Sequence, residues 1–90
     1  MIMMYEKFED EDLEELLETF IQNLVSVPEE VEIQKTTSPN GTEIFTIHVV
    51  DEDRGKIIGR GGCIIKSLNT IFHALGCKRG KKIELEIGED

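Results

Sequence analysis

The sequence predicts one α+β domain with the element order α-β-β-α-α-β. Two stretches place apolar residues at helical spacing, two alternating runs flank an Asn-Gly turn, and a third alternating run lies near the end of the chain. Ninety residues are enough for one domain and too few for two. We expect residues 12–88 to form this domain and residues 1–11 to be a flexible, acidic N-terminal segment.

The first predicted helix starts at Asp12 and is amphipathic. Acidic side chains occupy its first turn, where the helix dipole favours them, and also the face opposite the apolar stripe. Pro28 bars any continuation. The stripe comprises Leu13, Leu16, Leu17, Phe20, Ile21 and Leu24.

A β-hairpin is predicted next. Residues 31–35 alternate, the cluster Ser38-Pro39-Asn40-Gly41 turns the chain, and Phe45, Ile47 and Val49 share one face of the second run. The acidic run 51–53 should end that strand, with Asp51 capping a short helix over residues 54–58.

Gly59 to Gly62 interrupt the helical pattern, which resumes along residues 64–75 with Gly76 as the expected C-terminal cap. In the last strand Ile83, Leu85 and Ile87 alternate with charged residues. The crossover from the second strand to the third is long enough for parallel pairing, so the second strand should lie in the centre. The prediction is a three-stranded mixed sheet with three helices on one face.

Charge is divided sharply along the chain. The net charge is -9, yet residues 54–82 contain eight Lys and Arg residues and no acid. An acidic face can therefore coexist with a basic binding face, because screening keeps the two fields local. No apolar run is long enough to span a bilayer, and two cysteines are too few for a disulfide framework. We expect a cytoplasmic protein with no membrane partner.

The glycine-rich turn Gly59-Arg60-Gly61-Gly62 is the candidate binding site. Glycines allow a sugar–phosphate chain to approach the backbone, and the start of the next helix offers free N–H groups to an anion. Arg60 adds a cation there. Ile57, Ile58 and Ile65 would form an apolar groove for unpaired bases, which predicts binding of single-stranded nucleic acid.

Other site chemistries fit poorly. The glycines lack the Walker spacing, and the dinucleotide pattern fails at Ile64. His48, His73 and Cys63 belong to no cluster with ligand or catalytic spacing, so we predict no enzyme activity, no metal and no cofactor.

The stretch Ile57-Ile58-Gly59-Arg60-Gly61-Gly62-Cys63-Ile64-Ile65 resembles the Ile-Ile-Gly-x-x-Gly-x-x-Ile signature of KH domains. The element order resembles the type II KH arrangement. From about Asp12 to Gly88 the chain is similar to the bacterial single-KH family typified by KhpA. This resemblance implies binding of RNA without strong sequence preference, as a chaperone or post-transcriptional regulator linked to cell shape or envelope homeostasis. It also implies a homodimer, or a heterodimer with a larger KH-containing, KhpB-like protein.

By position, the resemblance implies that Gly59 to Gly62 hold the phosphate backbone, with Arg60 and Gly61 as the variable centre. Gly61 departs from the family, which often has a polar residue there. The full set of implied RNA contacts is Lys56, Ile57, Ile58, Gly59, Arg60, Gly61, Gly62, Ile65 and Lys66, with Arg54, Lys78, Arg79 and Lys81 as possible auxiliary contacts. Three alternatives stay open: a KH-shaped protein-interaction module with little affinity for nucleic acid, a preference for single-stranded DNA, and a nucleotide or phosphometabolite enzyme. The missing Walker and dinucleotide patterns weigh against the enzyme, which turnover with any nucleotide would revive.

Overall fold

The computed structural model describes residues 10–89 and confirms the predicted order of helices and strands. The main elements are α1 (Asp10–Gln22), β1 (Glu32–Thr37), β2 (Glu43–His48), α2 (Asp51–Ile58), α3 (Cys63–Lys78) and β3 (Ile83–Ile87). Two short 3-10 helices, η1 (Pro28–Glu30) and η2 (Arg60–Gly62), lie between them.

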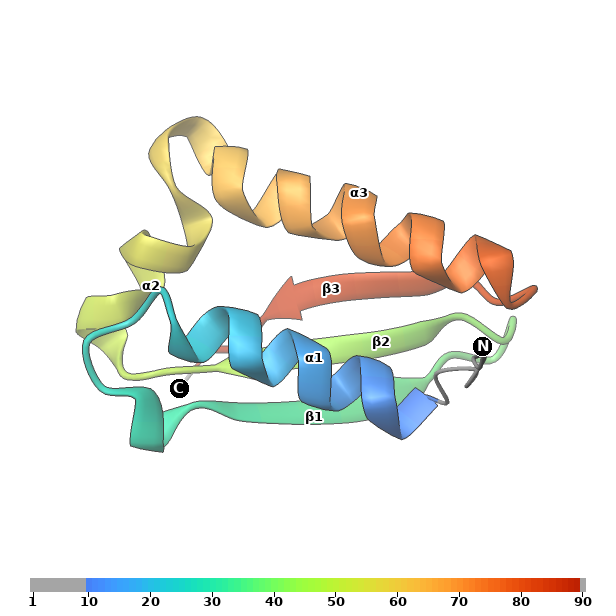
Figure 1. Cartoon of the computed structure of the whole chain (residues 1–90), viewed down its shortest axis with the longest axis horizontal. Helices are drawn as coiled ribbons and strands as arrows, with labels where there is room; N and C mark the ends of the chain where they lie inside the picture. Colours follow the sequence, from blue (N-terminus) through green and yellow to red (C-terminus); the bar gives the residue numbers. More distant parts are fainter. Residues whose placement is uncertain (1–9, 90) are drawn as a thin grey trace, which may run out of the picture.

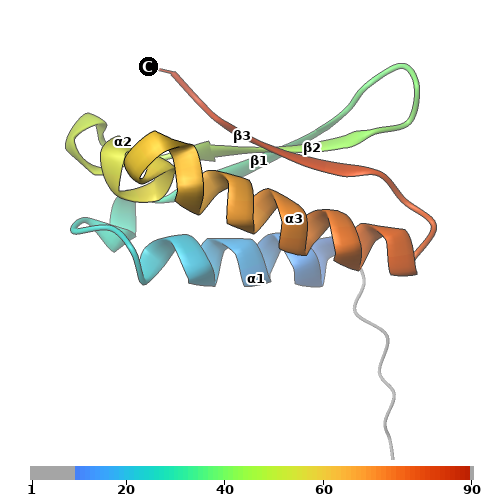
Figure 2. The same cartoon turned by 90° about the horizontal axis from the view of Figure 1, so that it is seen from above.

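The sheet has the predicted mixed topology. Its strand order is β1-β2-β3, with β1 antiparallel and β3 parallel to the central β2 (Figure 1). In Figure 2, α1 and α3 lie side by side on one face of the sheet, and α2 lies at the end of this helical layer. The other face of the sheet carries no helix from the described part of the chain.

The core lies between this helical layer and the sheet. Phe45 and Ile47 of β2 are completely buried, as predicted from the alternation, and Phe72 of α3 packs above them within the same apolar cluster. Only part of the predicted stripe is buried: Leu13, Leu17 and Ile21 have no exposed surface, whereas Phe20 is 41% exposed and Leu24, which lies past the end of α1, is 38% exposed. The predicted stripe is therefore wider than the surface that α1 buries.

Several helix ends differ from the prediction. α1 begins at Asp10, two residues early, and ends at Gln22, well before Pro28. The acidic residues 51–53 do not end a strand but form the first turn of α2. Asp51 is therefore not the cap: Val50 occupies that position and makes no side-chain capping bond. The expected N-terminal segment 1–11 lies outside the described residues except for its last two, which belong to α1.

The prediction that Gly76 ends α3 was wrong. Gly76 is buried inside the helix, and Gly80, with φ +73°, lies past its end. Lys81 N–H donates to the Gly76 carbonyl at 2.8 Å and Gly80 N–H to the Cys77 carbonyl at 3.1 Å, which is the Schellman pattern. A Cβ on Gly76 would lie 2.9 Å from the Lys81 carbonyl oxygen, so this glycine allows the close approach of the returning chain.

Within residues 10–89, each helix is too short or too polar to cross a membrane.

Candidate nucleic-acid interface

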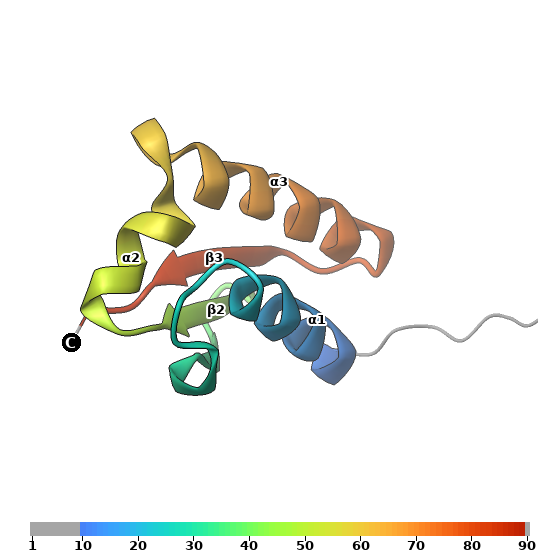
Figure 3. The ribbon, with the colours of Figure 1, turned by 60° about the vertical axis from the view of Figure 1, so that its left-hand side comes forward.

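The segment Gly59–Gly62, called the glycine loop below, forms the corner between α2 and α3 and projects away from the sheet (Figures 1 and 3). Gly59, Gly61 and Gly62 all have positive φ angles, of +78°, +64° and +79°. The Gly62 N–H donates to the Gly59 carbonyl at 3.1 Å. This backbone path favours glycine at three positions, so the glycines have a geometric role whatever binds there.

The first glycine and the centre of the glycine loop have different surroundings. A Cβ on Gly59 would lie 2.7 Å from Cγ1 of Ile64, so the first glycine packs against α3. A Cβ on Gly61 would meet no atom within 4 Å. The centre of the loop is therefore open to solvent and accessible to a ligand.

Positive charge gathers at the glycine loop. Arg60 is exposed, and the Lys66 ammonium donates to the Gly61 carbonyl at 3.3 Å. α3 starts directly behind the loop, without a side-chain cap and without an acid in its first turn. The Cys63 N–H already donates to the Arg60 carbonyl, so the two cations and the positive end of the α3 dipole are what favour an anion here.

Two of the three predicted groove isoleucines have accessible surface. Ile58 is 37% exposed at the end of α2, and Ile65 is half-buried on the first turn of α3. The prediction for Ile57 needs correction: its side chain is completely buried in the core and offers no surface to a base. Adjacent residues of a helix point in different directions, so Ile57 anchors α2 while Ile58 faces outward.

Lys56 is held by a buried acid that the sequence did not reveal. The carboxylate of Asp53 is completely buried and lies 3.0 Å from the Lys56 ammonium. It also accepts hydrogen bonds from the Ser26 hydroxyl at 2.6 Å and from the N–H groups of Ser26 and Val27, each at 3.1 Å. The Ser26 hydroxyl bond, with the backbone and Lys56 bonds, lowers the pKa of Asp53 well below its ordinary value although burial opposes this.

The auxiliary cations are not gathered at the glycine loop. Arg54 donates to the Gly88 carbonyl at 2.6 Å and to Asp51 at 3.3 Å, so it ties α2 to the end of β3. Lys78, Arg79 and Lys81 lie at the opposite end of α3 (Figure 1). Sixteen helical residues separate the two ends by about 24 Å. Lys81 pairs there with Glu43 at 3.5 Å.

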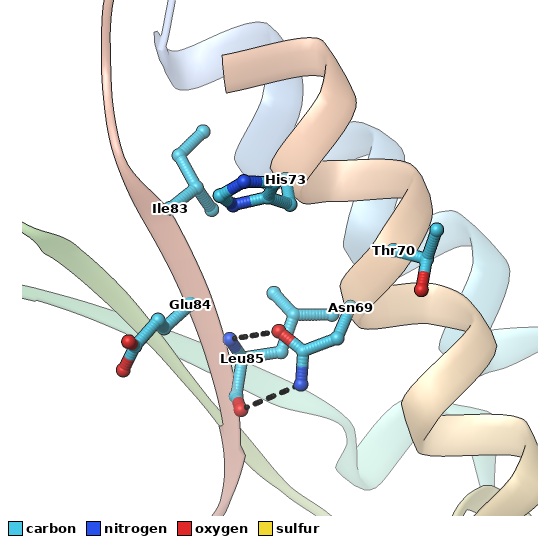
Figure 4. A pocket seen from close by; sticks show the side chains of 6 residues that line it. All are labelled: Asn69, Thr70, His73, Ile83, Glu84 and Leu85. Carbon is cyan, nitrogen blue, oxygen red and sulfur yellow. Dashed lines mark hydrogen bonds between the residues drawn. The ribbon is translucent and has the colours of Figure 1, made fainter. Parts of the chain in front are cut away.

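A shallow depression of about 450 Å³ lies further along α3, between that helix and the edge of β3 (Figure 4). Asn69 spans it: its Oδ1 accepts from the Leu85 N–H at 3.0 Å and its Nδ2 donates to the Leu85 carbonyl at 3.3 Å. In Figure 4 the His73 ring lies opposite Ile83, while the Glu84 carboxylate points away from α3. The depression is lined by Asn69, Thr70, His73, Ile83, Glu84 and Leu85.

Sequence reasoning missed Asn69 and gave His73 no role. Asn69 lies one helical turn after Ile65, so a polar residue at the border of the apolar stripe was the available signal. His73 and Cys77 both lie in α3, because the helix continues past Gly76. Among residues 10–89 no group of three His, Cys, Asp or Glu side chains has metal-site geometry.

A helix and strand followed by a β-α-α-β unit, with a glycine loop between its two helices, define a KH domain of the type II arrangement. The family model for the KhpA/KhpB KH domain matches residues 14–87. The chain belongs to this family.

Relatives in several bacteria match nearly end to end. The chain is 40% identical over 78 residues to the "RNA-binding protein KhpA" of Listeria monocytogenes, covering 86% of this chain and 100% of the relative. It is 36% identical over 75 residues to the protein of that name in Clostridium acetobutylicum, covering 83% and 99%. The corresponding Chlamydia caviae protein is 37% identical over 78 residues, covering 87% and 99%. No solved structure matches the chain significantly.

Proposed function

We propose that this protein is a non-catalytic, single-stranded RNA-binding KH domain whose glycine loop holds the phosphate backbone. The observation that carries the proposal is the open centre of the loop at Gly61, with Arg60 exposed beside it and Lys66 bonded across it. The relatives, named RNA-binding proteins, supply the ligand class.

The path of the bound RNA follows from the chemistry of the site. A phosphate at the glycine loop lies at the positive end of the α3 dipole and is neutralised by Arg60 and Lys66. The following bases turn toward the apolar surface of Ile58 and Ile65 and then reach the depression beside α3. Backbone contacts carry no base identity, so the expected sequence preference is weak.

We place this activity in the bacterial cytoplasm, as an RNA chaperone or post-transcriptional regulator connected to cell shape or envelope homeostasis. The family resemblance supports this assignment. A reporter of envelope stress, compared between a deletion strain and one complemented with the loop variant below, tests it.

The direct test is fluorescence anisotropy with a labelled pool of single-stranded RNA at near-physiological salt. The loop variant is Arg60→Asp with Gly61→Asp, which puts two carboxylates where phosphate should lie. The matched control is Lys78→Asp with Gly80→Asp. Gly80 also has a positive φ of +73° and open space around its Cβ position, so both variants change charge equally and strain one comparable glycine each.

The proposal predicts that the loop variant loses at least tenfold in affinity and that the control variant stays close to wild type. Equal binding by wild type and the loop variant would refute the role of the glycine loop. Loss of binding in the control variant alone would move the site to the basic segment at the far end of α3.

We further propose that the chain pairs with a second copy or with a larger KH-containing, KhpB-like protein. Exposed apolar side chains on α1 and α3 support this: Phe20 is 41% and Ile71 46% exposed. The Phe20 ring stacks edge-on against the buried Phe72 ring at a centroid distance of 6.2 Å, so α1 and α3 are in contact at this point. Light scattering of wild type and of Phe20→Glu with Ile71→Glu tests this, with dimer loss expected in the variant.

A further inference from the structure

The two hydrogen bonds between the Asn69 amide and the Leu85 backbone, called the Asn69 bridge below, lie at the edge of the sheet. β3 is an edge strand that pairs with β2 on one side, and Leu85 directs its N–H and C=O to the other side, toward α3. Backbone groups on an edge strand are free to bind a partner with the right donor and acceptor. Here the chain's own Asn69 amide already satisfies both groups of Leu85.

The amide of Asn69 has the hydrogen-bonding pattern of a nucleobase edge. It presents one acceptor and one donor side by side, as does the Watson–Crick edge of each base. The Asn69 bridge also lies on the path proposed above for the RNA, because Asn69 follows Ile65 by one helical turn and borders the depression.

We infer that the Asn69 amide is a displaceable substitute for a nucleobase: RNA entering the depression exchanges this intramolecular contact for a base bonded to the Leu85 N–H and C=O. The Asn69 side chain then turns to solvent. This inference rests on the proposed function and adds a regulatory property to it, because each binding event must first break two hydrogen bonds of the free protein.

Two consequences follow. The free protein keeps its strand edge closed, so only a ligand that offers both a donor and an acceptor gains from opening it. The affinity for RNA is also lower than it would be if the Leu85 N–H and C=O were not already bonded to Asn69. Removal of the Asn69 amide should therefore tighten binding, whereas removal of an ordinary structural contact would weaken it.

The first experiment uses the wild-type protein and nuclear magnetic resonance. The side-chain NH2 signals of Asn69 and the backbone N–H signal of Leu85 are followed during titration with a uridine hexamer. The inference requires the Asn69 signals to move to solvent-exposed positions while the Leu85 N–H keeps a hydrogen-bonded shift. Asn69 signals that stay unchanged at saturation would overturn it.

The second experiment measures affinity for two hexamers, one of uridine and one of N3-methyluridine, whose methyl group removes the donor of the base edge. Asn69→Ala should bind the uridine hexamer roughly threefold to tenfold more tightly than wild type and show no gain with the methylated hexamer. Ser67→Ala is the matched control, because Ser67 is an exposed polar residue of α3 outside the lining of the depression and bonds within the helix, to the Cys63 carbonyl.

Unchanged or weaker binding of the uridine hexamer by a folded Asn69→Ala variant would overturn the inference and leave the proposed function intact. Failure of wild type to bind either hexamer would overturn both. If Asn69→Ala does not fold, the resonance experiment on wild type still decides between displacement and a fixed structural bridge.

Discussion

The buried carboxylate of Asp53 holds the ammonium of Lys56 at 3.0 Å, one helical turn apart on α2. The same carboxylate binds Ser26 and Val27, which follow α1. Asp53 thereby fixes α2, the helix that leads into the glycine loop, to the segment that follows α1. The arrangement also explains why Lys56, a cation in the sequence motif, is partly neutralised within the fold.

Asp53→Asn should lower the melting temperature by on the order of 10 °C. An amide has one acceptor oxygen and cannot satisfy the hydroxyl and two N–H groups that the carboxylate binds. Circular dichroism melting at neutral pH measures the effect. Glu52→Gln, an exposed neighbour in the same helical turn, is the control and should melt within a few degrees of wild type.

The contribution of Asp53 should depend on pH in the acid range. Its pKa is lowered in the folded protein, so the stabilisation is fully present above the unfolded value of about 3.9 and is lost as the pH falls below it. Melting of wild type and Asp53→Asn at a series of pH values from neutral to about 2 tests this. The difference in melting temperature between the two proteins should shrink below about pH 4. A difference that stays constant with pH would contradict the lowered pKa of Asp53.

Two helical glycines should respond oppositely to alanine. A Cβ on Gly55 of α2 would meet no atom within 4 Å, so Gly55→Ala should stabilise the protein by about 0.5–1 kcal/mol through helix propensity. Gly76→Ala gains the same propensity but places its Cβ 2.9 Å from the Lys81 carbonyl oxygen and 3.0 Å from Ile83, and should destabilise by about 1–2 kcal/mol. Urea denaturation measures both; a stabilising Gly76→Ala would refute the close approach.

The glycine loop offers a similar comparison. Gly61→Ala meets open space and should cost about 1–2 kcal/mol, from the left-handed backbone alone. Gly59→Ala adds a contact of 2.7 Å with Ile64 to a backbone angle of +78° and should cost more. Equal losses of unfolding free energy in the two variants would show that Ile64 yields easily to the added methyl group.

The salt dependence of RNA binding should report the cations at the loop. Each phosphate neutralised on a single strand contributes about -0.7 to the slope of log affinity against log salt. Arg60→Ala should reduce the steepness by about that amount, whereas Lys78→Ala, at the far end of α3, should leave it unchanged. Anisotropy titrations at several salt concentrations measure both slopes.

The sequence by itself determined the order of elements, the mixed sheet and the position of the glycine loop. Alternation identified β2 and β3, helical spacing identified α1 and α3, and the glycines marked the corner between α2 and α3. These features depend on local periodicity and backbone freedom, which a linear pattern expresses directly.

Contacts between distant segments were decided only by the tertiary structure. It buried Ile57 but left Ile58 exposed, paired Lys56 with Asp53, placed the Lys78–Lys81 segment at the opposite end of α3 from the glycine loop, and kept Gly76 inside the helix where the chain returns toward β3. The same holds for the Asn69 bridge, whose partner Leu85 is sixteen residues away. Burial and pairing depend on which surfaces meet after folding, and spacing along a chain does not record that.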